Sequence, residues 1–480
     1  MYILTLLMAV IITAFLVVAK EPGPDSGDPG NPPGLPDQPG NPPGLPDQPG
    51  NPPGPPLFSK VFFPTDLSEM SNAMISCIAR MPGIRTLVLA HFLKDPDTSA
   101  RNEATRKIGL QQDMVRRSGI DTVVQVIDAG NIPIPEAILT TASVENAGLI
   151  VVGARKGLLS GSLLGPGAGL VLTNSRTHVL IMRFDSPGLL HRKSLYNPER
   201  TICSKIIFPT DFSKPAREAL EVLKQSGGVS EVVLLHVIRP VETDGKAQKR
   251  TLCVVNERLR RWQDELIGAG IPAATLIRYG KPCEEICQAA VDENASMIMM
   301  SRYGWMDYIR QIPLGTTTAQ VAATAKRPVL VVFSEIHVTV HARELKKDEF
   351  FFAEKIWLDY HQTKSDPEND RIFGVFVEDT PVSVARCKRH SDGYEVDGVF
   401  TWDEFRGRGY ARKAMEALIE GCGQQTLYMH AVLPLVNLYS SLGFVPIPEK
   451  DLPSTIRARY AWAMGEMKGA NVCPMRRAPE

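Results

Sequence analysis

The chain has 480 residues, of which 44% are hydrophobic and 22% charged, and its 53 basic and 53 acidic side chains cancel at neutral pH. This length predicts two to four domains, and the balanced charge argues against a nucleic-acid partner. The 8 cysteines include no Cys-x-x-Cys pair and no nearby histidine cluster. We therefore expect no metal site, no disulfide framework and a reducing compartment.

The first segment is strongly apolar. Residues 2–19, YILTLLMAVIITAFLVVA, carry no charge and would span about 27 Å as a helix, close to the thickness of a bilayer core. A cleaved signal peptide is the rival interpretation, but it needs a positive segment before a shorter apolar run. Lys20 favours a cytoplasmic body. The prediction is a single-pass transmembrane anchor at residues 1–20, with the membrane as partner and the globular domains in the cytoplasm.

Residues 21–56 are dominated by proline and glycine. The decapeptide GNPPGLPDQP occurs at 30–39 and again at 40–49, followed by GNPPGPP at 50–56. Such a composition cannot bury a core, and the uneven glycine spacing excludes a collagen triple helix. We expect a spacer.

Two similar segments follow. KVFFPTDLSEMSNAMI at 60–75 matches KIIFPTDFSKPAREAL at 205–220, and AGLIVVGARKG at 147–157 matches ASMIMMSRYG at 295–304. Short apolar runs alternate with helical patterns in both, which is typical of an open parallel α/β sheet. The sequence predicts two such domains, at residues 57–185 and 203–334.

Candidate ligand contacts lie where strands end, since ligands of open α/β sheets bind at the carboxyl ends of the strands. Pro64-Thr65-Asp66 and Pro209-Thr210-Asp211 follow the first strand of each copy, and Val237 lies near the end of a later one. Either aspartate could accept hydrogen bonds from a base or a ribose. The structural alternative is helix capping, because Asp66–Glu69 has the form of a capping box.

This organisation resembles the universal stress protein family over residues 58–184 and 203–334. The nucleotide-binding branch of that family carries Gly-x2-Gly-x9-Gly-Ser/Thr around the phosphates. Neither copy matches fully: the first has Gly153, Gly157 and Gly165 at altered spacings, and the second has Ser301 in place of the first glycine, then Gly304, Gly315 and Thr316. The resemblance implies ATP or AMP as ligand, and a homodimer through the universal stress protein domains is a further expectation. The alternative is a degenerate pair that acts as a dimer-like scaffold, because members of the family pair through their last strands.

The last part of the chain changes pattern. Residues 344–362 are helix-like, residues 371–401 predict three antiparallel strands, and the next helix has its apolar face at 411, 414, 415, 418 and 419. Between strand and helix stands Arg406-Gly407-Arg408-Gly409-Tyr410-Ala411. Free amides and the helix dipole attract anions there, and the glycines let the backbone approach them. The setting predicts a phosphate-binding loop.

These residues resemble the Arg/Gln-x-x-Gly-x-Gly/Ala signature of the GNAT N-acetyltransferases, and the resemblance covers residues 336–470. It implies that acetyl-CoA is the cofactor and that the strand residues Val399 and Thr401 flank the pantetheine arm. Residues 427–444 resemble the family's next strand, helix and Leu-Gly-Phe close.

The resemblance also implies a direct transfer in which a base assists the amine and a tyrosine protonates the departing thiolate. Tyr439 holds the tyrosine position, whereas Val432 replaces a frequent asparagine. Glu395 and Asp397 are the candidate bases, expected on the same strand face as Val399 and Thr401. Solvated carboxylates without a catalytic role are the alternative.

The fold class predicted is therefore α/β: two tandem open parallel-sheet domains of the universal stress protein type, followed by an α+β GNAT domain. The function predicted is a membrane-tethered N-acetyltransferase acting on a protein lysine or a small amine, with the tandem domains as a nucleotide-sensing or docking module. The alternative is a non-enzymatic stress-response scaffold that binds nucleotide or CoA.

Overall fold

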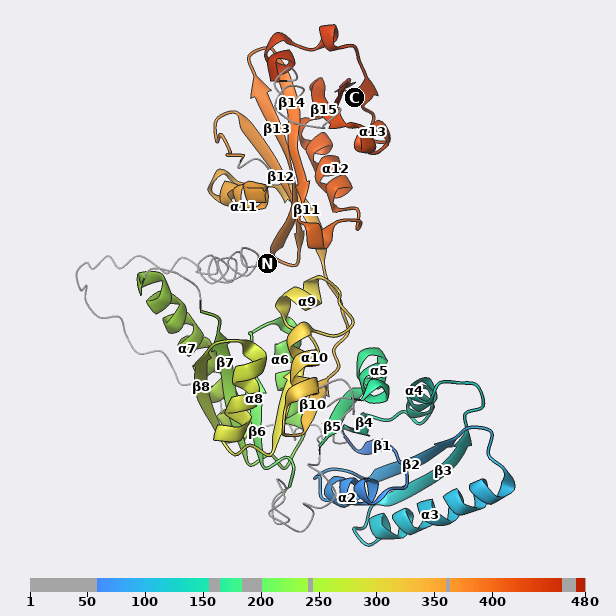
Figure 1. Ribbon diagram of the computed structural model, residues 1–480. Coiled ribbons are helices and arrows are strands. Elements are labelled where there is room, and N and C mark those ends of the chain that lie inside the picture. The colour runs from blue at the N-terminus through green and yellow to red at the C-terminus, as the bar shows by residue number, and fades with distance from the viewer. Residues whose placement is uncertain are drawn as a thin grey trace, which may run out of the picture. The chain divides into compact units, whose positions relative to one another are not determined.

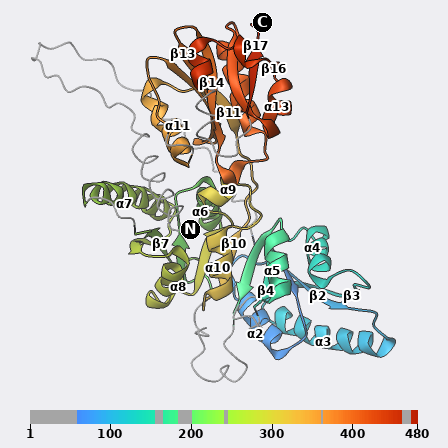
Figure 2. The same cartoon turned by 45° about the horizontal axis from the view of Figure 1, so that its top comes forward.

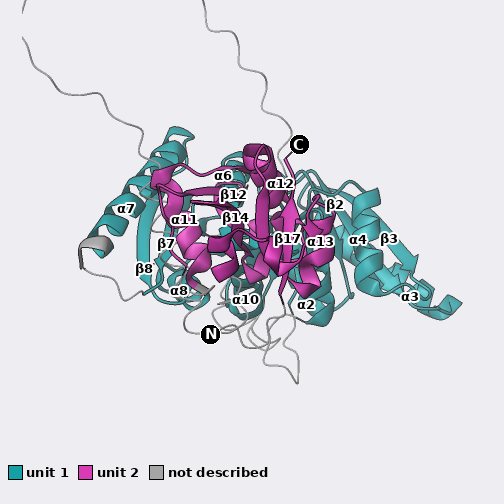
Figure 3. Ribbon diagram, turned by 90° about the horizontal axis from the view of Figure 1, so that it is seen from above, with its two compact units in different colours: residues 1–307, 312–335 teal, residues 308–311, 336–480 magenta. Residues whose placement is uncertain are grey.

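The computed structural model describes residues 58–154, 165–183, 201–240, 245–359, 363–459 and 472–479. The chain divides into two compact units, which are residues 1–307 with 312–335 and residues 308–311 with 336–480 (Figure 3). We describe each unit by itself.

The first unit contains two halves, each built from alternating strands and helices (Figure 1). The first half comprises β1 (Lys60–Pro64), α2 (Glu69–Ile78), β2 (Thr86–Leu93), α3 (Thr98–Arg116), β3 (Asp121–Asp128), α4 (Ile134–Val144), β4 (Leu149–Gly153), α5 (Pro166–Asn174) and β5 (His178–Met182). The second half comprises β6 (Lys205–Pro209), α6 (Lys214–Gln225), β7 (Glu231–Ile238), α7 (Gly245–Gly268), β8 (Ala273–Tyr279), α8 (Pro282–Asp292), β9 (Met297–Ser301), α9 (Trp305–Ile309), α10 (Thr316–Thr324) and β10 (Val329–Val332).

All ten strands form one sheet in the order β3-β2-β1-β4-β5-β10-β9-β6-β7-β8. Strands are parallel within each half, and the halves join where β5 and β10 pair antiparallel, with Leu180 opposite Leu330. Apolar residues on both faces of the sheet pack under helices, which explains why strands such as β9 are buried along their whole length. The last strands of the two halves thus pair inside one chain, as expected for a dimer-like pair of copies.

Buried arginines also hold the two halves together. Arg302, after β9, donates its guanidinium to the carbonyls of Thr173 and Ser175 at the end of α5. Arg183, after β5, donates to the carbonyl of Ala322 in the last turns of α10. Each half therefore neutralises the carbonyl end of the other half's last helix, where a cation is favoured.

The second unit is a twisted seven-stranded sheet in the order β11-β12-β13-β14-β15-β17-β16 (Figure 2). Its elements are β11 (Val340–Glu344), α11 (Phe350–Ile356), β12 (Asp370–Val377), β13 (Thr380–His390), β14 (Gly393–Thr401), α12 (Tyr410–Cys422), β15 (Leu427–Val432), α13 (Val436–Ser440), β16 (Val445–Pro446) and β17 (Val472–Arg477). β14 and β15 are parallel, whereas the other neighbouring strands are antiparallel. The helix expected over 344–362 is shorter, because Glu344 belongs to β11.

The membrane anchor expected at residues 2–19 and the spacer at 21–56 lie outside the described residues. Within the described ranges, no helix combines the length and the apolar character that crossing a bilayer requires. The longest of these helices, α3 with 19 residues and α7 with 24, carry ionic side chains along their length. This finding corrects the predicted single-pass membrane localisation.

Candidate functional site

The glycine-rich loop at residues 406–411 connects β14 to α12 through a short 3-10 turn, Asp403–Phe405. Gly407 and Gly409 have φ of 78° and 79°, a left-handed conformation that side chains with a Cβ rarely adopt. Gly409 is the N-cap of α12, and no side chain of the described residues caps this helix start. The loop therefore leaves the positive end of the α12 dipole for an anion.

Two side chains of the loop have structural tasks. Arg406 donates from Nε to the carbonyl of Thr401 at 3.1 Å and pairs with Asp403 at 2.9 Å. Tyr410 is buried and packs on Phe405, with ring centroids 6.4 Å apart. These contacts fix the loop on the strand end. The tyrosine ring is thus part of the core, and the main chain of the loop stays available for an anion.

The strands beside the loop separate. β14 and β15 pair in parallel over residues 394–396 of β14 and 427–429 of β15, with Val396 opposite Met429 as the last pair. On its other side, β14 stays paired with β13 as far as Thr401. From Asp397 onward, the β15-facing edge of β14 has no strand partner among the described strands. An extended ligand carrying amide groups can pair with such an edge.

A β-bulge in β14 overturns one expectation about this strand. Asp397 lies opposite Arg386, but Thr401 lies opposite Ser383, because the register shifts around Gly398, which has φ of 58°. Residues 383 and 386 are on opposite faces of β13. Asp397 is therefore on the opposite face from Val399 and Thr401, and the predicted shared face is wrong, since a bulge inserts one residue and reverses the alternation. Trp357 enforces the bulge by donating from Nε1 to the Gly398 carbonyl at 2.7 Å.

The two candidate bases are held in an ionic cluster. The Asp397 carboxylate accepts hydrogen bonds from Nε and Nη2 of Arg386 at 2.6 and 2.7 Å. It accepts a third from Nη2 of Arg459 at 2.9 Å. Arg386 is buried and also pairs with Asp370 at 3.1 Å. Although burial opposes its charge, the carboxylates raise the pKa of Arg386.

Glu395 is the more buried of the two carboxylates. Its side chain is 2% exposed, against 19% for Asp397. One of its oxygens lies 2.7 Å from Nε of Arg459 and 2.8 Å from Nε2 of His390. His430 stands 3.7 Å from its other oxygen, and burial lowers the pKa of this histidine. A water molecule can therefore reach the carboxylate of Asp397 more easily than that of Glu395.

Tyr439 lies on α13, beyond the carboxyl end of β15, and is 4% exposed. Its ring packs against Phe444 with a centroid distance of 6.4 Å. Because β14 and β15 are parallel, α13 follows the same sheet edge as the glycine loop (Figure 1). The structure thus gathers the loop, the open edge of β14 and Tyr439 at one edge of the sheet. The carboxylates flank that edge from the other face of β14.

In the first unit, both Pro-Thr-Asp elements form the same turn. Pro64 and Pro209 end their strands, and the residues after the aspartates, Leu67 and Phe212, have φ of 62° and 60°. The carbonyls of Thr65 and Thr210 each meet a histidine Nδ1 from the next strand at 2.8 Å. This shared geometry builds the turn without any ligand.

The aspartates of these turns bond within the protein. The N-cap of α2 is Ser68, and Asp66 accepts hydrogen bonds from the amide of Ser68 at 3.0 Å and the hydroxyl of Ser71 at 2.6 Å. Asp211 accepts the amide of Trp305 at 2.7 Å, beside Gly304. Asp66 therefore supports the cap without being the cap itself. Val237 is partly buried on β7.

One glycine in each copy leaves no room for a side chain. A Cβ at Gly153 would meet Met74 at 2.6 Å, and one at Gly315 would meet the Arg302 carbonyl at 2.9 Å. Gly165 is the N-cap of α5, and Gly157 lies outside the described residues.

The start of α10 is occupied by a carboxylate. Asp307 accepts the amide of Thr316 at 2.8 Å and its hydroxyl at 3.2 Å. Thr316 is the residue that we expected to bind phosphate. A carboxylate in this place satisfies the helix start in the same way as an anionic ligand.

The sequence did not predict the residues that pair with Asp397, Glu395 and Thr316. Arg386, Arg459, His390 and Asp307 carry no motif, and each meets its partner through tertiary contact or a loop. A weak signal was available for Arg386 and His390, because both lie on β13, the strand next to the one that carries Asp397 and Glu395.

Comparisons with known proteins place two families on this chain. The universal stress protein family model matches residues 203–332, and the acetyltransferase (GNAT) family model matches residues 339–444. Universal stress protein MJ0577 of Methanocaldococcus jannaschii is 30% identical over 152 residues, which cover 27% of this chain and 93% of that protein.

Two solved structures are similar to parts of this chain. A universal stress protein from Archaeoglobus fulgidus is 21% identical with a TM-score of 0.42, and the match covers 57% of this chain and 97% of that chain. ElaA of Escherichia coli is 16% identical with a TM-score of 0.22, and the match covers 29% of this chain and 99% of that chain.

Proposed function

Because the chain belongs to the universal stress protein family through residues 203–332 and carries a GNAT acetyltransferase domain at residues 339–444, we propose that it is an N-acetyltransferase that moves an acetyl group from acetyl-CoA to an amine. The acceptor class is a protein lysine or a small amine. The first half of the α/β unit has the same strand order as the second, and we infer a second universal stress protein domain there.

One observation carries this proposal: the left-handed glycines of the loop lead into a helix start without a side-chain cap, next to the open edge of β14. The amides of residues 407–411 would hold the diphosphate of the cofactor. The edge near Val399 and Thr401 would pair with its pantetheine amides. Both contacts would be made by main-chain groups of the protein. Main-chain N–H groups can bind the phosphate oxygens, and a strand edge can pair with the amide groups of the pantetheine arm.

The transfer would proceed in one complex. The neutral amine nitrogen attacks the thioester carbonyl and then loses one proton to solvent water. The carbon–sulfur bond breaks, and the Tyr439 hydroxyl gives its proton to the thiolate and is reprotonated from solvent. Main-chain N–H groups at the open edge would stabilise the negative charge that develops on the carbonyl oxygen. Asp397 is the better candidate for removing the ammonium proton through water, since its side chain is more exposed than that of Glu395.

For the second half of the α/β unit we favour a docking role over nucleotide binding. Asp307 already satisfies the amide of Thr316, and a phosphate there would face this carboxylate at close range. ATP or AMP binding by the first half stays a prediction that rests on the family resemblance.

The test uses the full chain. Calorimetry with acetyl-CoA measures binding, and release of the free thiol in the presence of mixed amines measures turnover. Binding with turnover supports the acetyltransferase, whereas binding without turnover for any amine class favours the alternative, a CoA-binding scaffold. Failure to bind acetyl-CoA at all would remove both.

A further inference from the structure

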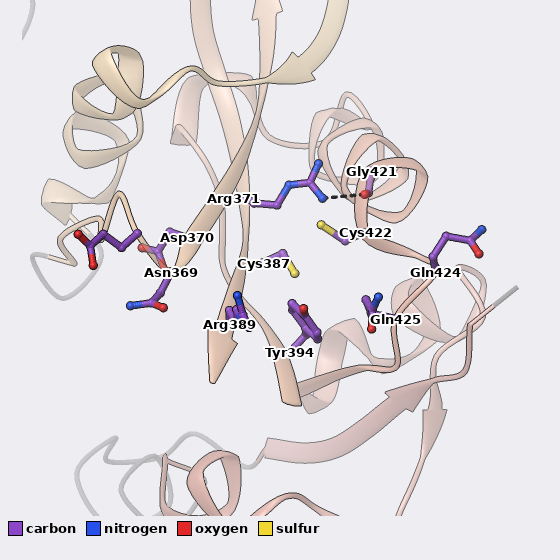
Figure 4. Close-up of a pocket in the computed structure, with 11 residues that line it drawn as sticks. Asn369, Asp370, Arg371, Cys387, Arg389, Tyr394, Gly421, Cys422, Gln424 and Gln425 are labelled. Carbon is purple, nitrogen blue, oxygen red and sulfur yellow. Dashed lines mark hydrogen bonds between the residues drawn. The ribbon is translucent and has the colours of Figure 1, made fainter. Parts of the chain in front are cut away.

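A cavity of about 320 Å³ lies at the far end of α12 from the glycine loop. Its lining includes Arg371 on β12, Cys387 on β13, Tyr394 on β14, and Gly421 and Cys422 at the end of α12. Figure 4 shows the side chains of Cys387 and Cys422 turned toward one another between Arg371 and Tyr394. The proposed acetyl transfer uses none of these residues.

The two thiols belong to different elements. Cys387 lies on β13 and Cys422 is the last residue of α12, which packs on that strand. They are 1% and 4% exposed, and both are free thiols. Both side chains line the same cavity, and Figure 4 shows them facing one another from the two packed elements. Two buried thiols that face one another from a strand and the helix packed on it are candidates for a disulfide.

Arg371 makes the two thiols unequal. It donates from Nη1 to the carbonyl of Gly421 at 2.8 Å and so covers the negative end of α12 beside Cys422. The hydrogen bond from Cys387 and the charge of Arg371 lower the pKa of the Cys422 thiol. The contact with Cys422 and burial raise the pKa of Cys387. Of the two, Cys422 is therefore the thiol that loses its proton more easily, and the thiolate is the form that reacts with oxidants.

We propose that Cys387 and Cys422 form an oxidation-responsive dithiol that closes to an internal disulfide when a peroxide enters the cavity. The Cys422 thiolate attacks one peroxide oxygen, the oxygen–oxygen bond breaks, and the sulfenic acid of Cys422 forms with release of water. The Cys387 sulfur then attacks the Cys422 sulfur, the sulfur–oxygen bond breaks, and a second water leaves. Two thiols and one hydrogen peroxide give one disulfide and two waters, and a dithiol reductant reverses the step.

The chain contains its own comparison pair. Cys283 and Cys287 lie four residues apart on α8, and both sulfurs contact the hydroxyl of Thr324, at 3.4 and 3.6 Å. Burial raises the pKa of Cys287 to about 11. A bond between these two residues would have to form along one helix. Cys253 is a single exposed cysteine on α7.

The experiment treats the full chain with hydrogen peroxide, blocks the remaining thiols and digests with a protease that cleaves after acidic residues. Cys387 then lies in the peptide 380–392 and Cys422 in the peptide 421–449. We expect these two peptides to appear joined, lighter by two hydrogen atoms than their sum, and to separate on reduction. We expect the joined peptide to form at least about tenfold faster than any product linking Cys283 and Cys287.

Variants assign the roles. In Cys387→Ser, peroxide should leave a sulfenic acid at Cys422 that a dimedone probe captures, whereas Cys422→Ser should leave Cys387 unmodified. Cys253→Ser should leave the joined peptide unchanged. Sulfinic acid at both positions without a joined peptide, or joining at the same rate as for Cys283 and Cys287, would overturn the proposal. The wild-type digest decides this even if a serine variant fails to fold.

Discussion

The carboxylate of Asp307 accepts the backbone amide of Thr316 at 2.8 Å, at the start of the helix where the family resemblance places a phosphate. The protein's own anion therefore occupies a position that a nucleotide needs. This hydrogen bond is the reason why we favour a docking role over nucleotide binding for the second half of the α/β unit, and a substitution at Asp307 tests it.

We expect Asp307→Ala to strengthen ATP binding by the full chain about tenfold or more, because it removes a negative charge beside the amide of Thr316. It should also lower stability by about 1 kcal/mol, since α10 loses its cap. Calorimetry with ATP and urea unfolding check both effects. Asp113→Ala, an exposed position on α3, is the matched control. Strong ATP binding by the wild type that Asp307→Ala weakens would contradict the docking role.

Gly409 should be essential for the cofactor. Gly409→Ala places a methyl group where the phosphates would approach, and we expect acetyl-CoA binding to weaken about tenfold or more. Gly270→Ala is the control, because Gly270 has the same conformation, φ of 80° against 79°, and equally open surroundings. Both variants should lose about 1 kcal/mol of stability. Equal acetyl-CoA affinities in the two variants would argue that the loop does not bind the diphosphate.

Tyr439→Phe should lower kcat about a hundredfold or more while the acetyl-CoA dissociation constant stays within twofold, or about 0.4 kcal/mol. The reason is that the hydroxyl acts only when the thiolate leaves. The buried ring and its packing on Phe444 are preserved in the variant. Steady-state thiol release and calorimetry measure the two quantities, with Tyr279→Phe, an exposed tyrosine on β8, as control. An unchanged kcat would remove the acid role.

Arg386 is expected to be required for folding of the GNAT domain. Arg386→Met leaves Asp370 and Asp397 without their main cation in a buried setting, and we expect a loss of about 3–5 kcal/mol. Arg389→Met, on the same strand but exposed, should change stability by less than about 0.5 kcal/mol. Chemical unfolding of the full chain, followed by tryptophan fluorescence, compares the two. Similar losses would mean that the cluster contributes little.

His178 should make the α/β unit sensitive to acid. Burial lowers the pKa of His178 to about 4, and its Nδ1 accepts the amide of Phe333 at 3.1 Å in the neutral form. Since the unfolded chain binds the proton more readily, stability should fall as pH drops from about 6.5 to about 4, by on the order of 3 kcal/mol.

The control for this effect is His178→Asn, which keeps an acceptor near Nδ1 but cannot take up a proton. Unfolding by urea at several pH values in that window should give a smaller pH dependence for the variant than for the wild type. Parallel curves for the two proteins would show that His178 does not titrate as its surroundings imply.

Local pattern predicted much of the architecture. Apolar runs at 60–64 and 205–209, followed by helical periodicity, indicated an α/β sheet because a parallel strand is buried on both faces. The glycine pair at 407 and 409 indicated a loop before a helix in which the backbone can approach an anion. These features depend on residues close together in sequence, so the sequence alone contains them.

Other features depend on contacts between distant segments. The side-chain faces of β14 follow from the bulge at Gly398, which Trp357 holds from 41 residues away. The arginines around Asp397 and the cavity shared by Cys387 and Cys422 arise only when strands and helices pack. The sequence by itself determined which elements form and where the glycine loop lies. The tertiary structure alone decided which charges and thiols meet, because burial and pairing depend on the fold and not on spacing along the chain.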